Sequence, residues 1–194
     1  MRRLDRQALW SLEEYATRRE AFRAETIAHK RPRRIALGPH ATLAFEDFQT
    51  MKYQVQEMLR AERIFDPAEI EAEIAAYDPL IPDGRNWKAT FLIEYEDVAE
   101  RRIALERLAG IEQRVWVQVA GHAKVHAIAN EDLDRTRGEK TAAVHFLRFE
   151  LTDAMAESVK GGAAIAIGID HPNMKATVDP IAPASRDALA HDLD

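Results

Sequence analysis

An acidic residue and a histidine, Asp170 and His171, stand together at the end of one of the most apolar stretches of the chain. A carboxylate beside an imidazole can transfer protons or bind a metal ion at neutral pH. The stretch before the pair predicts a buried strand, and strand ends are where rigid backbone meets solvent. In the alternative that we favour, Asp170 caps the turn before Pro172 and His171 forms a hydrogen bond with a backbone carbonyl.

Three other histidines invite a metal or acid–base interpretation. His122 and His126 are four residues apart, a spacing that places two ligands on one face of a helix. Their surroundings predict a hairpin instead, and the HExxH motif of zinc peptidases is absent. His145 begins an alternating apolar strand, where we expect a hydrogen-bonded histidine at the margin of the core. We therefore predict neither a bound metal nor a cofactor.

A polar stripe follows the helix predicted over residues 48–65, and its members are Gln56, Glu57, Arg60 and Arg63. Arg148 and Glu150 alternate along a predicted strand. If the helix faces the sheet, these side chains form a buried network that, with His145 or His171, makes a site for a ligand or a partner. Otherwise Glu57 and Arg60 form an exposed ion pair on the helix, which contributes about 0.2–0.5 kcal/mol to stability.

Several kinds of chemistry are excluded by what the sequence lacks. Because there is no cysteine, the chain has no disulfide, no thiolate nucleophile and no cysteine-ligated zinc or iron–sulfur cluster. The GxxxxGK(S/T), GxGxxG and GxSxG motifs are absent, so phosphate cradling and serine hydrolysis have no support. The repeated Glu-x-x-His helices of ferritin-type di-iron proteins are also missing.

Charge is distributed unevenly along the chain. The net charge is −6, but residues 1–34 hold ten Lys and Arg against five Asp and Glu. The basic run over 30–34 has no interleaved aromatic residues, and the rest of the chain is acidic. We interpret the run as a solvated connector or a patch that docks on an acidic protein, rather than as a nucleic-acid site.

The sequence shows no targeting or membrane segment. Charged residues follow Met1 without the apolar stretch of a signal peptide. No run approaches the ~18 apolar residues that cross a bilayer. We expect a cytoplasmic protein that does not insert into membranes.

Hydrophobic periodicity predicts an α+β protein. Helices are predicted over residues 5–29, 48–65, 97–108 and 152–160, and one more begins at Pro67 and ends before Pro79. Strands are predicted over 34–37, 42–46, 88–95, 114–119, 124–128, 144–151 and 163–169. A charged loop is expected over 131–138.

These elements predict one mixed, largely antiparallel sheet covered by helices. We divide the chain into an N-terminal helical arm (1–33), an α+β core domain (34–172) and a loosely held C-terminal tail (173–194). The apolar stripe of the arm is narrow, so it packs on the domain surface or on a second subunit, as in a homodimer. Its members are Leu9, Leu12, Tyr15 and Phe22.

Four segments resemble the bacterial DUF3501 family and occur in the family's order: Tyr53 to Ile64, Tyr77 to Pro82, His145 to Leu151 and Asp170 to Pro172. The resemblance covers residues 34–172. It implies a genomic context, because genes of this family tend to lie beside a rubrerythrin-like di-iron protein and an iron–sulfur protein of the heterodisulfide-reductase type.

Three functions are compatible with these observations. The resemblance implies an accessory protein of redox or oxidative-stress metabolism, which acts through rubrerythrin-like or iron–sulfur protein partners. The polar stripe and the histidines favour an enzyme or a binding protein for a small molecule or metal. The narrow stripe of the N-terminal arm favours a structural homodimer.

Overall fold

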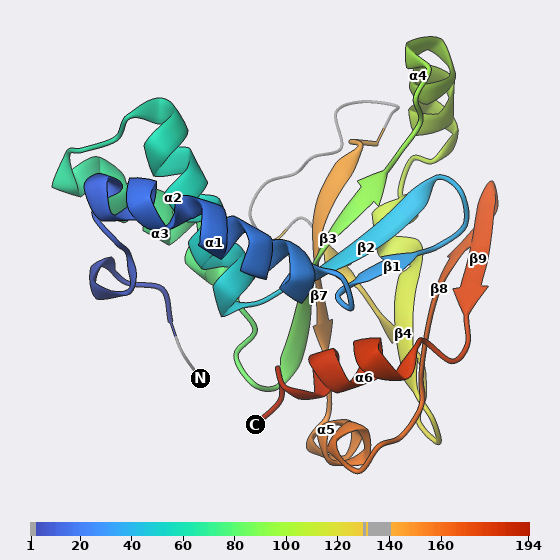
Figure 1. Ribbon diagram of the computed structural model, residues 1–194. Helices are drawn as coiled ribbons and strands as arrows, with labels where there is room; N and C mark the ends of the chain where they lie inside the picture. Colours follow the sequence, from blue (N-terminus) through green and yellow to red (C-terminus); the bar gives the residue numbers. More distant parts are fainter. Residues whose placement is uncertain (1–2, 130, 132–140) are drawn as a thin grey trace.

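The computed structural model of the chain describes residues 3–129, Glu131 and 141–194, and it divides into a helical lobe and a β-sandwich (Figure 1). The expected loop over 131–138 therefore lies, apart from its first residue, outside the described residues. No helix in the described part of the chain is long and apolar enough to span a bilayer.

The helical lobe stands to one side of the sheets (Figure 1). It consists of α1 (Leu12–Lys30), α2 (Phe48–Glu62) and α3 (Pro67–Tyr77), with the short 3-10 helices η1 (Arg6–Ala8) and η2 (Asp78–Leu80). Each long helix begins at a capping side chain, because Ser11, Asp47 and Asp66 accept hydrogen bonds from the first turn. The lobe has its own apolar core, made of Leu4, Met51, Val55, Leu59, Ile70, Ile74 and Ile81.

The sandwich is formed by two antiparallel sheets. The first has the order β1 (Arg34–Ala36), β2 (Ala41–Glu46), β3 (Asn86–Ile93), β7 (Val144–Glu150) and β6 (Ile128–Ala129). The second has the order β5 (Val125–His126), β4 (Val115–Val119), β8 (Ile165–His171) and β9 (Met174–Val178).

The main core lies between the two sheets, because alternate side chains of each strand point inward. On β3 the inward residues include Trp87 and Phe91, and on β8 they include Ile167; all three are fully buried. Outside the second sheet, Trp116 lies across β8 at Gly168. A Cβ added at Gly168 would lie 2.4 Å from the Trp116 ring, so only glycine fits there.

Short helices close the ends of the sandwich. The helices α5 (Asp153–Lys160) and α6 (Pro183–Ala190) lie together at one end, while α4 (Val98–Arg107), followed by η3 (Ile111–Arg114), projects at the other (Figure 1). The predicted caps of α4 and α5 are present, at Asp97 and Thr152.

The α+β class and the largely antiparallel pairing are confirmed, and the strands divide into two sheets instead of one. Two sheets form, and every strand pair in the described ranges is antiparallel. The prediction and the structure differ at the predicted hairpin over 114–128. Its second strand ends at His126, and the chain then crosses to the first sheet as β6.

The C-terminal tail is also corrected. Instead of trailing loosely, residues 173–194 form β9 and α6, and Leu189 is fully buried. The alternation of Met174, Ala176 and Val178 carries apolar side chains onto the core. The prolines at 180 and 183 flank these elements rather than disrupting them, and Pro183 occupies the tolerated first turn of α6.

The N-terminal arm is part of the helical lobe. Tyr15 and Phe22 are buried within the chain, and Leu9 and Leu12 pack against the core of the lobe. The stripe of α1 therefore does not require a second subunit for its burial. Self-association stays a prediction.

Candidate functional site

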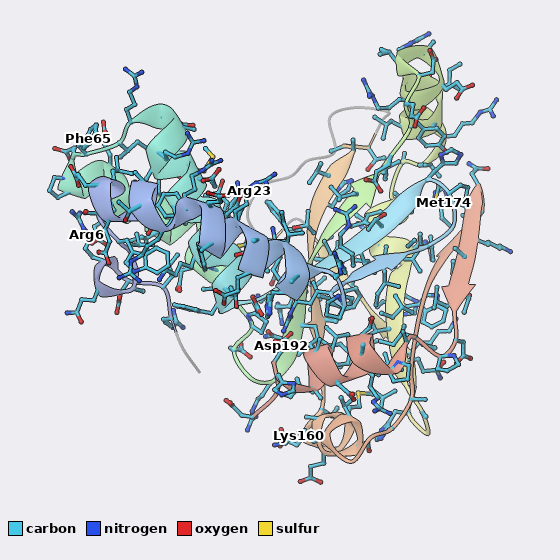
Figure 2. The ribbon with its side chains drawn as sticks, in the orientation of Figure 1. Arg6, Arg23, Phe65, Lys160, Met174 and Asp192 are labelled. Atoms are coloured by element: carbon cyan, nitrogen blue, oxygen red, sulfur yellow. The ribbon has the colours of Figure 1, made fainter. Side chains whose placement is uncertain are left out.

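A cleft of about 590 Å³ lies where the helical lobe meets the sandwich and α6. Phe48, Ile81 and Pro82 form its apolar wall. Figure 2 labels Asp192 at this junction, just beyond α6. We call it the interlobe cleft, and its polar lining consists of His29, Arg33, Asp47, His191, Asp192 and Asp194.

Asp47 joins two basic side chains through one carboxylate oxygen. Its Oδ2 lies 2.5 Å from Nε2 of His29 and 3.0 Å from a guanidinium nitrogen of Arg33. The other oxygen accepts a hydrogen bond from the backbone N–H of Thr50 at 2.9 Å, which caps α2. Burial would raise the pKa of Asp47, but His29, Arg33 and Thr50 together lower it below the usual value.

Arg33 is the buried centre of the site, with only 3% of the residue exposed. It donates hydrogen bonds of 2.9 and 2.8 Å to Asp192 and one of 3.1 Å to the carbonyl oxygen of Ala188. Burial acts to lower the pKa of Arg33, but Asp192 and then Asp47 raise it above the ordinary value. Burial raises the pKa of Asp192, and Arg33 opposes that rise. This network links the end of α1 to the end of α6.

His29 is the group in the cleft best placed for proton transfer. Its side chain is 31% exposed, and its Nε2 is bound to Asp47. Within the described chain its Nδ1 has no hydrogen-bond partner, so it can contact a molecule in the cleft. A carboxylate that orients an imidazole is a common acid–base arrangement.

The cleft carries an excess of negative charge. Three carboxylates line it, on Asp47, Asp192 and Asp194, against the single guanidinium of Arg33. This excess favours ligands with ammonium or hydroxyl donors. Among the residues that the structure describes, no three histidine, aspartate or glutamate side chains are arranged to hold a metal ion.

The polar stripe of α2 faces the N-terminal segment and not β7, so the alternative of a buried network with β7 does not form. Gln56 is fully buried, accepts the backbone N–H of Trp10 at 2.8 Å and donates to its carbonyl oxygen at 3.4 Å. Glu57 accepts the hydroxyl of Tyr15 at 2.7 Å and two bonds from Arg19 at 2.8 and 2.9 Å. These contacts fasten η1 and α1 to α2.

The remaining arginines of the predicted network lie apart from one another. Arg60 and Arg63 are exposed. Arg60 pairs with Glu57 at 3.4 Å, as the second alternative predicts, and Arg63 ends α2 in a left-handed conformation. On β7, Arg148 donates bonds of 2.9 and 2.8 Å to Glu131 and also binds Glu150. The candidates on the helix and those on the strand therefore belong to two separate clusters.

His145 lies inside the sandwich and is fully buried. Its Nε2 is 2.7 Å from the hydroxyl of Thr141 and 3.0 Å from the carbonyl oxygen of Ala142. The carboxylate of Glu112 lies 4.0 Å away, and Thr141 donates to it at 3.2 Å. Glu112 was not among our candidates, because a lone glutamate after Ile111 has no recognisable motif.

His171 forms a hydrogen bond with a backbone carbonyl, as in the alternative that we favour. Its Nε2–H donates to the carbonyl oxygen of Ala109 at 3.2 Å, and its Nδ1 accepts the backbone N–H of Asn173 at 3.2 Å. Both ring nitrogens are therefore used within the protein. Asp170 does not cap the turn through its side chain; it pairs with Lys124 at 2.9 Å.

Sequence reasoning missed the residues of the interlobe cleft. The basic run over 30–34 was interpreted as a solvated connector, yet Arg33 is buried. An aspartate immediately before a predicted helix is a signal that identifies Asp47 as a cap. No local pattern pairs Arg33 with Asp192, because they are 159 positions apart.

Comparison with known proteins agrees with this architecture. A family model described as a protein of unknown function (DUF3501) matches residues 3–193. A crystal structure of a protein of unknown function from Burkholderia pseudomallei is 51% identical, with a TM-score of 0.94 and full coverage of both chains. No curated protein matches the chain.

Proposed function

The chain belongs to the DUF3501 family, whose function is unknown. From the geometry of the interlobe cleft, we propose that the protein binds a small molecule in this cleft and that His29 acts as proton donor or acceptor. The observation that carries this proposal is the double contact of Asp47. It holds the partly exposed His29 at the cleft, while Arg33 binds the same carboxylate from the buried side. A charged network of this kind is costly to bury, which supports a use beyond folding.

The lining indicates the class of ligand. The volume lies within the ~300–1,000 Å³ of ordinary small-molecule sites. The carboxylates favour a donor group such as an ammonium, and the wall of Phe48, Ile81 and Pro82 suits an apolar body. We therefore propose a small amphipathic amine as the ligand class, with proton exchange at His29 as the available chemistry.

The proposal is tested with two probes of similar size and opposite charge, benzylamine and benzoate. Each is titrated into the protein while NMR follows the ring signals of His29 and the methyl signals of Ile81. We expect benzylamine to shift both sets of signals in a saturable way and benzoate to leave them unchanged. The variant His29→Gln should weaken the binding of benzylamine, whereas His122→Gln, at a residue of the β4–β5 turn that does not line the cleft, should not.

Two outcomes would refute this function. Equal responses to both probes would show that the carboxylates do not select the ligand. If neither probe nor a wider set of amphipathic amines shifted the signals of His29, the cleft would be a structural junction rather than a binding site.

A second candidate is the accessory role in redox metabolism that the resemblance implies. The observation that favours protein partners is the exposure of apolar side chains on the projecting helix α4, where Val98 is 68% and Ile103 is 44% exposed. Calorimetry with the purified rubrerythrin-like and iron–sulfur proteins tests this role. The double variant Val98→Glu/Ile103→Glu should abolish any binding through α4, and absence of binding to either partner would reject the role.

A further inference from the structure

A second cleft, of about 400 Å³, adjoins the interlobe cleft and shares Ile81 and Pro82 with it. Lys88, on β3, lines this second cleft. Because Trp87 and Ala89 point into the sandwich, the alternation of the strand places Lys88 on the outer face of the sheet. We call this the Lys88 cleft; its other charged lining residues are Arg3, Asp78 and Asp83.

Lys88 is partly buried and, within the described part of the chain, its side-chain amine makes no hydrogen bond or ion pair. Its neighbours in register are Glu46 on β2 and Arg148 on β7. Arg148 is held in place by Glu131 and Glu150, so its charge stays close to the lysine. An amine in these surroundings has no carboxylate partner of its own.

The surroundings of Lys88 increase the neutral fraction of its amine. Burial lowers the pKa of Lys88, and the charge of Arg148 lowers it further. Glu131, Asp83 and Glu150 raise the pKa of Lys88, but it remains below the ordinary value for lysine. A neutral amine is a nucleophile, whereas an ammonium is not.

The charges of the Lys88 cleft also select the ligand. An anion entering it would meet the carboxylates of Asp78 and Asp83, and the guanidinium of Arg3 is already paired with Asp78. Asp78 already accepts bonds from Arg3 and from the backbone of Leu4. A neutral carbonyl compound avoids this repulsion and can react with the amine.

We propose that the Lys88 cleft binds small neutral aldehydes or ketones and that Lys88 forms an imine with them. The Nζ atom attacks the carbonyl carbon to give a carbinolamine, and the oxygen then leaves as water when the C=N bond forms. The two protons on the neutral amine leave with that oxygen, so no oxidant or reductant is consumed. The carboxylate of Asp83 can transfer the protons. This site and its chemistry are independent of amine binding in the interlobe cleft.

The test is reductive trapping on the full chain. The protein is incubated at neutral pH with benzaldehyde and cyanoborohydride, and peptide mapping by mass spectrometry measures the rate of adduct formation at each lysine. We expect Lys88 to react severalfold faster than the exposed Lys160, with a rate that saturates as the benzaldehyde concentration rises. Saturation is required because simple amine reactivity increases linearly with the probe.

Variants separate the site from general reactivity. Lys88→Arg should remove the fast-reacting fraction, whereas Lys160→Arg should retain it. Arg148→Gln removes a neighbouring positive charge, so the rate at Lys88 should fall several-fold while the rate at Lys160 stays constant; a thermal melt confirms that the variant is folded. The proposal is overturned if Lys88 reacts no faster than Lys160, or if its rate shows no saturation.

Discussion

Arg33 and Asp192 are 159 positions apart in the chain, yet they form a two-point ion pair with nitrogen–oxygen distances of 2.9 and 2.8 Å. Both residues are buried. The pair connects the segment that follows α1 to the segment that follows α6, and it forms one side of the interlobe cleft. The geometry of the cleft therefore depends on this contact.

Removing Asp192 should destabilise the protein strongly. In Asp192→Ala, the guanidinium of Arg33 keeps its contact with Asp47 but loses both bonds to Asp192 in a buried position. Breaking a buried ion pair costs about 3–5 kcal/mol. Urea unfolding measures this change. Asp187→Ala, which removes the exposed contact with Arg186, is the control and should cost about 0–1 kcal/mol. Equal costs for the two variants would contradict the assigned role of Asp192.

The contact of Glu57 on α2 with Arg19 and Tyr15 on α1 should make the stability of the protein depend on pH in the acid range. Hydrogen bonds from Arg19 chiefly, and also from Tyr15, lower the pKa of Glu57 from 4.5 to about 2. Because the pKa is depressed in the folded state, the stabilisation is complete above pH 4.5 and is lost as the pH falls from 4.5 towards 2.

We expect Glu57→Gln to remove this part of the pH dependence. It amounts to about 1–2 kcal/mol of the free energy of unfolding, because solvent screens the ion pair at the partly exposed Arg19. Urea unfolding at pH 5 and pH 3 measures it. Glu62→Gln, at an exposed glutamate at the end of the same helix, should keep the pH dependence of the original chain. If Glu57→Gln kept the same difference in the free energy of unfolding between pH 5 and pH 3 as the original chain, the ion pair would contribute little to stability.

Deleting residues 189–194 should prevent stable folding. The deletion removes the fully buried Leu189, the buried Leu193 and the partner of Arg33. It also removes the carbonyl oxygen of Leu189 that accepts the indole N–H of Trp87 at 2.9 Å. Circular dichroism and a thermal melt detect the loss. A cooperative melt close to that of the full chain would restore the view that this segment is a loose tail.

Gly168→Ala should cost about 1–3 kcal/mol, the usual penalty for overpacking. The new Cβ would lie 2.4 Å from the Trp116 ring and 2.7 Å from the carbonyl oxygen of Ala176, and a backbone atom cannot move aside easily. Thermal melts check this. Gly161→Ala is the comparison, because its nearest contact is 3.3 Å and its cost should be smaller.

Local features of the fold were predictable from the sequence because they depend on neighbouring residues. Asp97 and Thr152 each precede an apolar helical repeat, and both are helix caps in the structure. The apolar run before Asp170 was predicted to be a buried strand, and β8 is buried between β4 and β9.

Contacts between distant residues were not predictable in this way. Their charges make Glu57 and Arg148 suitable partners, but nothing in their spacing indicates that α2 faces α1 instead of β7. Arg33 lies in a basic run whose composition is typical of exposed segments, and its burial depends on a carboxylate near the other end of the chain. The interlobe cleft consists largely of such contacts, which explains why none of its residues was among the candidates.

The position of α6 in the chain has a consequence for synthesis on the ribosome. Residues 181–194 are synthesised after every strand that the structure describes, so Leu189 and Leu193 are the last residues of the apolar core to become available. During that interval Arg33 has no Asp192 and Trp87 has no acceptor for its indole N–H. Completion of the fold is therefore a late event, and a nascent chain stalled before α6 exposes apolar surface that chaperones recognise.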